Sequence, residues 1–142
     1  MLDKINVMLD DGAYMPTRAH DEDSGLDLYS PIPFTMSGPD AYVTIDTGVH
    51  VEIPKGYTGF LKSKSGLNVK FGIRSEGVID SGYTGSIVVK LYRNSKDYTP
   101  KFFDRGDKIT QLVILPIETP TPVLVESFKE TDRGDNGFGS TG

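Results

Sequence analysis

The stretch GVIDSGYTG at residues 77–85 sets a carboxylate, an aromatic ring and several glycines close together. Val78 and Ile79 favour a strand, and the turn residues that follow include Gly82, which can adopt a positive φ. With the alternating residues after it, the stretch predicts a β-hairpin. A hairpin tip of bare backbone, with Asp80 and Tyr83 on its wall, suits a flat polar ring joined to a sugar. An ordinary tight hairpin with a solvated Asp80 fits the same residues.

Three further polar clusters can do chemistry. Ser63-Lys64-Ser65-Gly66 precedes a short predicted helix, and free N–H groups, hydroxyls and a lysine there make an anion site. Plain helix capping is the alternative. Asp27 lies between two leucines and faces either solvent or a metal-bound water. Gln111, on a long apolar strand, can orient a water or a phosphate, or only satisfy backbone groups.

The C-terminal stretch ETDRGDNGFGSTG, residues 130–142, has one large apolar side chain and cannot build a core. A disordered terminus is one interpretation. The other is a lid, in which Arg133 holds a phosphate, Phe138 stacks on a base, Gly139 lets the backbone approach, and Ser140 and Thr141 donate hydroxyls. We expect an arm that is mobile without ligand and closes over it when bound.

Short strands punctuated by 16 glycines and 9 prolines predict an all-β fold. We expect a jelly-roll sandwich or barrel over residues 1–125, with one short helix capped by Ser65, and a flexible arm over residues 126–142. The predicted strands, besides the hairpin, cover residues 5–9, 26–30, 42–45, 49–53, 57–62, 98–103, 109–117 and 123–125.

The bulk composition narrows the function classes. A chain of 142 residues predicts one domain, and its net charge of −5 argues against non-specific nucleic-acid binding. The absence of cysteine excludes disulfides, thiolate catalysis and cysteine zinc sites. No apolar run is long enough to span a membrane, and no signal peptide is visible, so we expect a cytoplasmic protein, or a nuclear or viral one in an infected cell, and not a secreted one. His20, in a polar loop, and His50, on an exposed strand face, are not expected to be catalytic.

Taken together, the clusters suit a ligand with a flat base, a sugar and several phosphates. In their order along the chain and in their amino-acid sequences, they resemble the five motifs of the trimeric dUTPase family (deoxyuridine triphosphate nucleotidohydrolases). The matching stretches are SGLDLYS at 24–30, KSKSG at 62–66, GVIDSGYTG at 77–85, GDKITQL at 106–112 and RGDNGFGSTG at 133–142.

The resemblance implies hydrolysis of dUTP to dUMP and pyrophosphate, with Mg²⁺ carried mostly by the triphosphate. The backbone of Gly77, Val78 and Ile79 would read uracil. Asp80 would hold the 3′-hydroxyl and activate the attacking water. Tyr83 would pack beneath the deoxyribose, and Gln111 would help to place the water.

The remaining matches concern the phosphates and the metal. Asp27 would contact the water shell of Mg²⁺. Lys64, Ser65 and Gly66 would bind phosphate, and the arm would close with Arg133 at the γ-phosphate and Phe138 over uracil. The resemblance also implies a homotrimer with shared sites and, for phage-borne members, a regulatory protein partner.

Some positions depart from the family pattern. Lys64 and Lys108 stand where arginine is usual, Thr110 stands where alanine is common, and Asp135 adds a negative charge near the phosphate clamp. Two other functions remain open. One is a dCTP deaminase of the same fold, which needs a glutamate beside the base, with Glu76 just before the hairpin. The other is a nucleotide-gated binding protein without catalysis.

Overall fold

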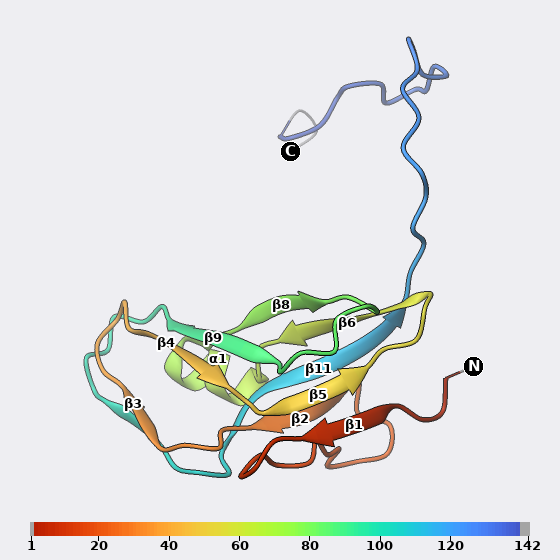
Figure 1. The fold of residues 1–142 in the computed structure, drawn as a ribbon. Coiled ribbons are helices and arrows are strands. Elements are labelled where there is room, and N and C mark those ends of the chain that lie inside the picture. The colour runs from red at the N-terminus through yellow and green to blue at the C-terminus, as the bar shows by residue number, and fades with distance from the viewer. Residues whose placement is uncertain (1, 140–142) are drawn as a thin grey trace.

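The computed structural model describes residues 2–139, and strands account for most of the regular structure in that range (Figure 1). One short helix, α1 (Ser65–Phe71), accompanies eleven strands within these residues. The strands are β1 (Asn6–Leu9), β2 (Gly25–Tyr29), β3 (Phe34–Met36), β4 (Tyr42–Asp46), β5 (Val49–Glu52), β6 (Tyr57–Lys62), β7 (Ile73–Arg74), β8 (Glu76–Ile79), β9 (Val88–Arg93), β10 (Lys101–Phe103) and β11 (Lys108–Pro116).

The strands form several small antiparallel sheets rather than one large sheet. The largest has the order β2-β11-β6-β8, and a second has the order β4-β9-β7. The pairs β1-β5 and β10-β3 complete the set. Segments far apart in sequence therefore lie side by side, as in a jelly roll, and β11 is central because it pairs with both β2 and β6.

The core lies between these sheets and consists almost entirely of aliphatic side chains. Alternation along β9 buries Val89 and Leu91 while Val88 and Lys90 face out, which is the pattern expected of a strand with one covered face. Ile109 and Leu112 of β11 are fully buried, but its last residues are exposed. This long apolar strand is therefore covered on both sides only over its first half.

The predicted hairpin at residues 77–85 is wrong in one respect. β8, which precedes the turn, pairs with β6, whereas β9, which follows it, pairs with β4 and β7. The two strands belong to different sheets, because Ile87 bonds the backbone of Thr47 and Val49 instead of β8. Residues 77–85 thus form a crossover between sheets, which we call the 77–85 loop. Gly82 does not adopt the positive φ that a glycine allows.

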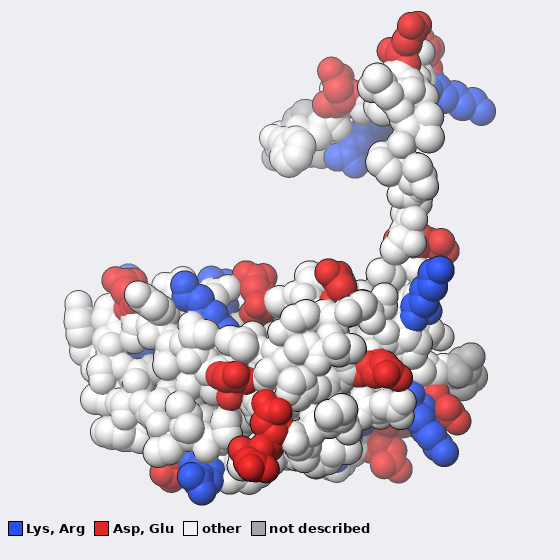
Figure 2. Space-filling view, in the orientation of Figure 1, with Lys and Arg blue, Asp and Glu red and all other residues white. Residues whose placement is uncertain are grey.

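Residues 117–139 extend away from the body after β11 ends at Pro116 (Figure 1). The strand predicted at 123–125 is absent from this segment, where Val123 and Leu124 are exposed. Regular structure therefore stops before the expected arm boundary at residue 125, and we call residues 117–139 the arm. Acidic and basic side chains both occur along the arm, and others are scattered over the visible face of the body (Figure 2). No helix in the described part of the chain is long and apolar enough to cross a membrane.

Candidate functional site

A buried carboxylate joined to two lysines lies where three predicted clusters meet. Asp27 of β2 is 4 % exposed. Lys64 Nζ donates to its Oδ1, and Lys108 Nζ lies 3.2 Å from its Oδ2. Asp27 therefore does not face open solvent, because it is buried and both of its oxygens are engaged by lysines, whereas its contact with a metal-bound water stays a prediction.

The charges of this cluster control the ionisation of its members. Burial raises the pKa of Asp27, but the hydrogen bonds and charges of Lys64 and Lys108 outweigh it and hold that pKa below its usual range. The hydrogen bond to Asp27 in turn raises the pKa of Lys108. The cluster therefore carries one negative and two positive charges at neutral pH, an excess of positive charge that suits an anion.

Gln111 lies beside this cluster on β11, with its register partners Asp27 on β2 and Lys62 on β6. Its Nε2 donates to the carbonyl of Ser63 at 2.9 Å, which leaves Oε1 as an acceptor. A methyl group at Gly25 would overlap the Gln111 side chain, so glycine at that position makes room for the amide. Gln111 thus satisfies a backbone group, as one interpretation held, and keeps an acceptor for a water or hydroxyl.

Thr110, a departure from the family pattern, has a structural role next to Gln111. Its hydroxyl is buried, lies 2.8 Å from Ser75 Oγ and donates to the carbonyl of Lys62 at 3.1 Å. Ser63 Oγ in turn donates to the carbonyl of Ser75. These bonds tie β11 to the end of β6 and to the residue before β8, and so fix the segment that leads into Lys64.

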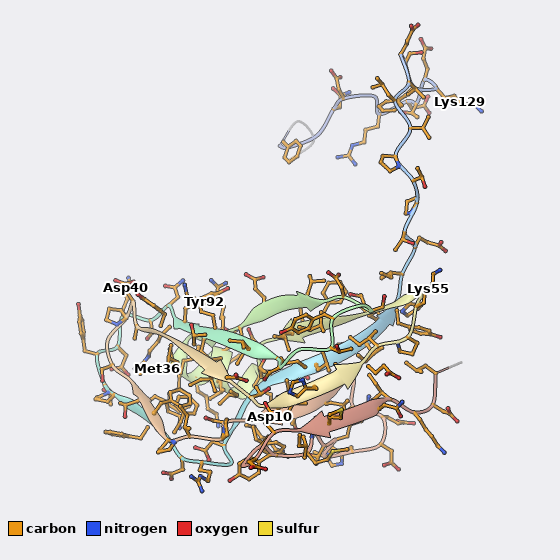
Figure 3. The ribbon with its side chains drawn as sticks, in the orientation of Figure 1. Asp10, Met36, Asp40, Lys55, Tyr92 and Lys129 are labelled. Carbon is orange, nitrogen blue, oxygen red and sulfur yellow. The ribbon has the colours of Figure 1, made fainter. Side chains whose placement is uncertain are left out.

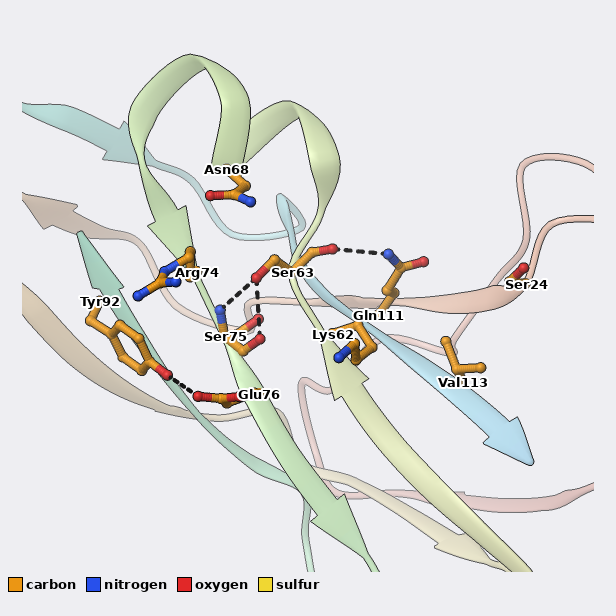
Figure 4. Close-up of a pocket in the computed structure, with 10 residues that line it drawn as sticks. All are labelled: Ser24, Lys62, Ser63, Asn68, Arg74, Ser75, Glu76, Tyr92, Gln111 and Val113. Atoms are coloured by element: carbon orange, nitrogen blue, oxygen red, sulfur yellow. Dashed lines mark hydrogen bonds between the residues drawn. The ribbon is translucent and has the colours of Figure 1, made fainter. Parts of the chain in front are cut away.

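A polar cavity of about 520 Å³ opens beside these residues (Figure 4). Ser63 and Gln111 line one part of it, and Asn68, Arg74 and Glu76 line another. Glu76 accepts a hydrogen bond of 2.8 Å from the hydroxyl of Tyr92. The cavity has the size of a ligand pocket, and its lining is polar enough for a charged ligand.

The start of α1 differs in detail from the prediction. Lys64 occupies the N-cap position, no side chain caps the helix, and Ser65 is the first helical residue rather than the cap. Lysine has no acceptor for a free N–H, and its ammonium is held by Asp27. Ser65 and Gly66 are exposed, and a Cβ built on Gly66 meets nothing within 4 Å. This open first turn leaves its N–H groups available to a ligand.

The 77–85 loop presents Asp80 and Tyr83 on a separate part of the surface. Both side chains are exposed, and they line a hollow of about 270 Å³ together with Val78 and Ile79. The Tyr83 hydroxyl donates to the carbonyl of Ser86 at 2.7 Å, and its ring lies directly over Gly85, where a Cβ would come within 2.6 Å of Tyr83 Oη. Gly85 is therefore needed because the ring occupies the space of its side chain.

The arm holds the other predicted residues. Arg133 Nε donates to the carbonyl of Asn136 at 2.6 Å, which closes a local turn. Phe138 is fully exposed with a φ of 47°, a left-handed conformation that is uncommon for phenylalanine, and Gly139 follows with a φ of 96°. Ser140 and Thr141 lie outside the described residues. Nothing in the structure explains Asp135.

One chain therefore brings together some predicted residues and separates others. The Asp27–Lys64 ion pair lies next to Gln111, which lines the cavity, whereas Asp80 and Tyr83 line a hollow that shares no residue with it. The arm points away from both (Figure 1). Arg74, Asn68 and Tyr92 were missed as lining residues, and no motif in the sequence distinguishes them. His50 lies on the outward face of β5, as predicted, but its ring is only 25 % exposed and is bonded at both nitrogens.

These features define a β-sandwich protein with a local site for an anionic ligand on an acidic chain. Comparison with known proteins then gives the family. A model of the dUTPase family matches residues 11–142. The deoxyuridine 5′-triphosphate nucleotidohydrolase of Mycolicibacterium gilvum is 42 % identical over 96 % of this chain and 92 % of its own length. That of Mycobacterium tuberculosis is 41 % identical over the same shares.

Solved structures agree with these relatives. The dUTPase of Staphylococcus bacteriophage 80alpha with dUPNHPP has a TM-score of 0.88 and 32 % identity, and the match covers 99 % of each chain. A mutant dUTPase from phage phi11 of S. aureus, described as coordinating a structural Mg(II) ion, has a TM-score of 0.81 and 31 % identity over 90 % of this chain and 100 % of its own. The chain belongs to the dUTPase family, which is a family of hydrolases, and its jelly-roll fold is the fold of these structures.

Proposed function

We propose that this protein hydrolyses dUTP to dUMP and pyrophosphate, which would lower the dUTP available to polymerases and supply dUMP for dTMP synthesis. The observation that carries the proposal is the excess positive charge of Lys64 and Lys108 around Asp27, built beside a polar cavity on a chain of net charge −5. Such a local site suits a triphosphate, and the family relatives act on this one.

The 77–85 loop supplies the base and sugar contacts in this proposal. The backbone of Gly77, Val78 and Ile79 pairs with uracil, and Tyr83 packs beneath the deoxyribose, where it leaves no room for a 2′-hydroxyl. Asp80 holds the 3′-hydroxyl and the attacking water. A carboxylate is a weak base, so Asp80 acts mainly by position and charge. The water oxygen bonds to the α-phosphorus, the bond to the bridging oxygen breaks, and pyrophosphate leaves.

The lysine cluster and the first turn of α1 supply the phosphate contacts. Ser65 and Gly66 offer free N–H groups, and Lys64 moves from Asp27 to a phosphate oxygen. Gln111, held through Ser63, keeps its free Oε1 for the attacking water. The arm then covers the ligand, with Arg133 at the γ-phosphate, Phe138 on uracil, and Gly139, Ser140 and Thr141 around them.

The residues present can contribute to a magnesium site but cannot form one alone. The described residues contain no group of three His, Asp or Glu side chains placed to hold a metal, so no protein cage exists there. Asp27 offers one carboxylate, and Mg²⁺ typically uses one or two carboxylates with substrate phosphates and waters. We therefore assign Asp27 to the water shell of a phosphate-bound Mg²⁺, which when bound neutralises phosphate charge. The phage phi11 relative, with its Mg(II) ion, supports a role for this metal in the family.

A homotrimer with shared sites explains why one chain keeps its motifs apart. Asp80 and Gln111 line separate hollows, so each site would combine the cavity of one copy, the 77–85 loop of a second and the arm of another. Copies carrying Asp80→Asn and copies carrying Gln111→Ala, each impaired alone, would regain activity when refolded together. Random assortment would restore about a quarter of the sites. If the mixture is no more active than its components, sites are not shared.

The direct test is pyrophosphate release from dUTP with Mg²⁺, beside dCTP, dTTP and UTP. The full chain, a chain cut before Arg133 and the Asp80→Asn variant are compared. We expect release from dUTP alone, its loss with the cut, and loss of turnover with retained binding in Asp80→Asn. Absence of release from any nucleotide, with dUTP still bound, would refute hydrolysis and favour a binding protein.

A deaminase is less well supported. Glu76 is exposed and already accepts a hydrogen bond from Tyr92, and it is absent from the hollow of Asp80. Ammonia release from dCTP would support that alternative.

A regulatory role is the second function that we propose. The phage 80alpha dUTPase, which matches over 99 % of both chains, is described as controlling the transfer of virulence genes by a G protein-like mechanism. A protein partner that this chain captures and that dUTP releases would support such a role. Retention of every captured partner in the presence of dUTP would refute it.

A further inference from the structure

His50 bridges two acceptors that lie on different parts of the chain. Its ring stands on β5, with Nδ1 2.8 Å from the carbonyl oxygen of Thr84 and Nε2 2.9 Å from Asp10 Oδ1. Asp10 follows β1, and its N–H bonds the carbonyl of Gly48 just before β5. Figure 3 places Asp10 at this end of β1, beside the start of β5. The imidazole therefore connects the end of β1, β5 and the 77–85 loop.

The bond to Thr84 acts on the part of the loop that carries Tyr83. Further along, the chain is already fixed to the segment before β5, because Ser86 Oγ donates to Asp46 and Ile87 N–H donates to the carbonyl of Val49. Thr84 lies between Tyr83 and Gly85, beyond those anchors. The hydrogen bond from His50 therefore fixes one more residue of the loop, Thr84, which is next to Tyr83.

The protonation state of His50 decides whether both bonds exist. A carbonyl oxygen and a carboxylate only accept hydrogen bonds, and a neutral imidazole has a single N–H to donate. The imidazolium donates to both at once. The acidic groups facing the ring are Asp10 and, farther away, Asp46, and Glu52 lines the same small hollow. The hydrogen bond to the Thr84 carbonyl, followed by that to Asp10, raises the pKa of His50, the charges of Asp10 and Asp46 add to this, and burial lowers it.

We propose that protonated His50 is a positioning residue for the 77–85 loop, and that it makes binding of the deoxynucleotide dependent on pH. The inference rests on the proposed function only in taking dUTP as the ligand of the loop. A group whose pKa is raised on folding contributes its full stabilisation below its ordinary pKa, near 6.5, and loses it as the pH rises through the raised value. The bond from His50 to the loop is therefore fully present below about pH 6.5 and is lost as the pH rises through the raised pKa of His50.

The first test is the pH dependence of KM and kcat for dUTP hydrolysis from pH 5.5 to 9. Wild-type KM should rise about fivefold on the alkaline side, the change expected from one lost hydrogen bond, with a smaller change in kcat. His50→Gln cannot gain the proton, so its KM should already be high at acidic pH and show no such step. Any effect of nucleotide ionisation on KM is the same for both enzymes, so the difference between the two profiles reports on His50 alone.

Two further variants sharpen this test. Asp10→Asn keeps an acceptor oxygen but removes the charge, so the step in KM should remain and move to lower pH. His20→Gln replaces the other histidine of the chain and should leave the wild-type profile unchanged. Parallel profiles for wild type and His50→Gln, or an unmoved step in Asp10→Asn, would overturn the proposal.

A measurement without nucleotide separates this inference from the proposed function. The ¹³C signal of the Thr84 carbonyl is followed by NMR during a pH titration, together with the ¹⁵N signals of the His50 ring. Both should titrate with one midpoint, and the carbonyl response should vanish in His50→Gln. Even if dUTP is not hydrolysed, this titration still tests whether protonated His50 holds the Thr84 carbonyl. A Thr84 carbonyl that does not respond would refute it whatever the kinetics.

Discussion

Gly85→Ala tests the geometry of the 77–85 loop most directly. A methyl group at this position would lie 2.6 Å from Tyr83 Oη and 2.7 Å from Cζ. The ring would have to move by about 0.8 Å before ordinary van der Waals contact, near 3.4 Å, is restored. The same movement breaks the 2.7 Å hydrogen bond from Tyr83 to the carbonyl of Ser86. The substitution therefore displaces the ring without removing any of its atoms.

The expected kinetic effect follows from that displacement. Misplacement of a substrate-positioning group by about 1 Å costs up to 10²-fold in rate, so kcat/KM for dUTP should fall by about 10- to 100-fold. Global stability should change little, because Tyr83 is 44 % exposed and contributes little to the core. Steady-state pyrophosphate release and urea unfolding measure the two quantities.

Gly82→Ala is the matched control for the contact with the ring. It lies in the same loop, has no positive φ, and a Cβ there meets nothing within 4 Å. The NMR signals of the Tyr83 ring should stay in place in this variant and shift in Gly85→Ala. Wild-type kcat/KM in Gly85→Ala, with the ring signals shifted, would refute the positioning role of Tyr83.

Three other substitutions test the lysine cluster and the glutamine. Asp27→Asn should destabilise the fold by about 1–3 kcal/mol at pH 7, since two lysines lose a carboxylate partner. Because folding lowers the pKa of Asp27, its contribution is complete above the ordinary pKa and disappears as the pH falls below it. Urea unfolding at pH 3 and 7 should therefore show less acid destabilisation in Asp27→Asn than in wild type, and an equal loss would contradict the assignment. Gly25→Ala should displace Gln111 from the carbonyl of Ser63 and lower kcat about fivefold, the size of one lost hydrogen bond, and unchanged kcat would exclude a role for the amide. Lys64→Arg should lower KM for dUTP severalfold because the guanidinium binds phosphate with two donors, and a higher KM would show that the site is shaped for lysine.

Local pattern was sufficient where a strand has one buried face. The strand predicted at 57–62 is β6, and the one predicted at 42–45 is β4 with one more residue. β4 alternates between exposed and less exposed residues, and alternation is a local property of the chain, whereas β6 departs from it because the neighbouring residues Thr58 and Gly59 are both buried. The segment 123–125 shows the limit of this reasoning. It has strand-forming valines, but a strand also needs a partner, and none lies beside it in this structure.

The error at residues 77–85 has a different physical origin. A tight turn between two alternating stretches is typical of a hairpin, but the pattern records which residues face inward and not which strand they pair with. β8 and β9 both bury one face, and the pairing depends on β6 and β4, which lie earlier in the sequence. Long-range pairing of this kind is set by the whole core, so the crossover could not be predicted from the turn.

The same limit applies to the site. The spacing of motifs indicated which residues belong to one ligand but not whether one chain can place them together. The structure places the Asp27–Lys64 ion pair beside Gln111, which lines the cavity, because β2, the end of β6 and β11 are neighbours in one sheet. Asp80 leaves that sheet at the end of β8, the strand at its edge, and turns toward β9. These strand pairings fix the positions of Gln111 and Asp80. Bringing the two side chains together within one copy would therefore require strands of the core to unpair. Assembly of several copies would complete the site without that cost, and the topology therefore supports the shared sites that we propose.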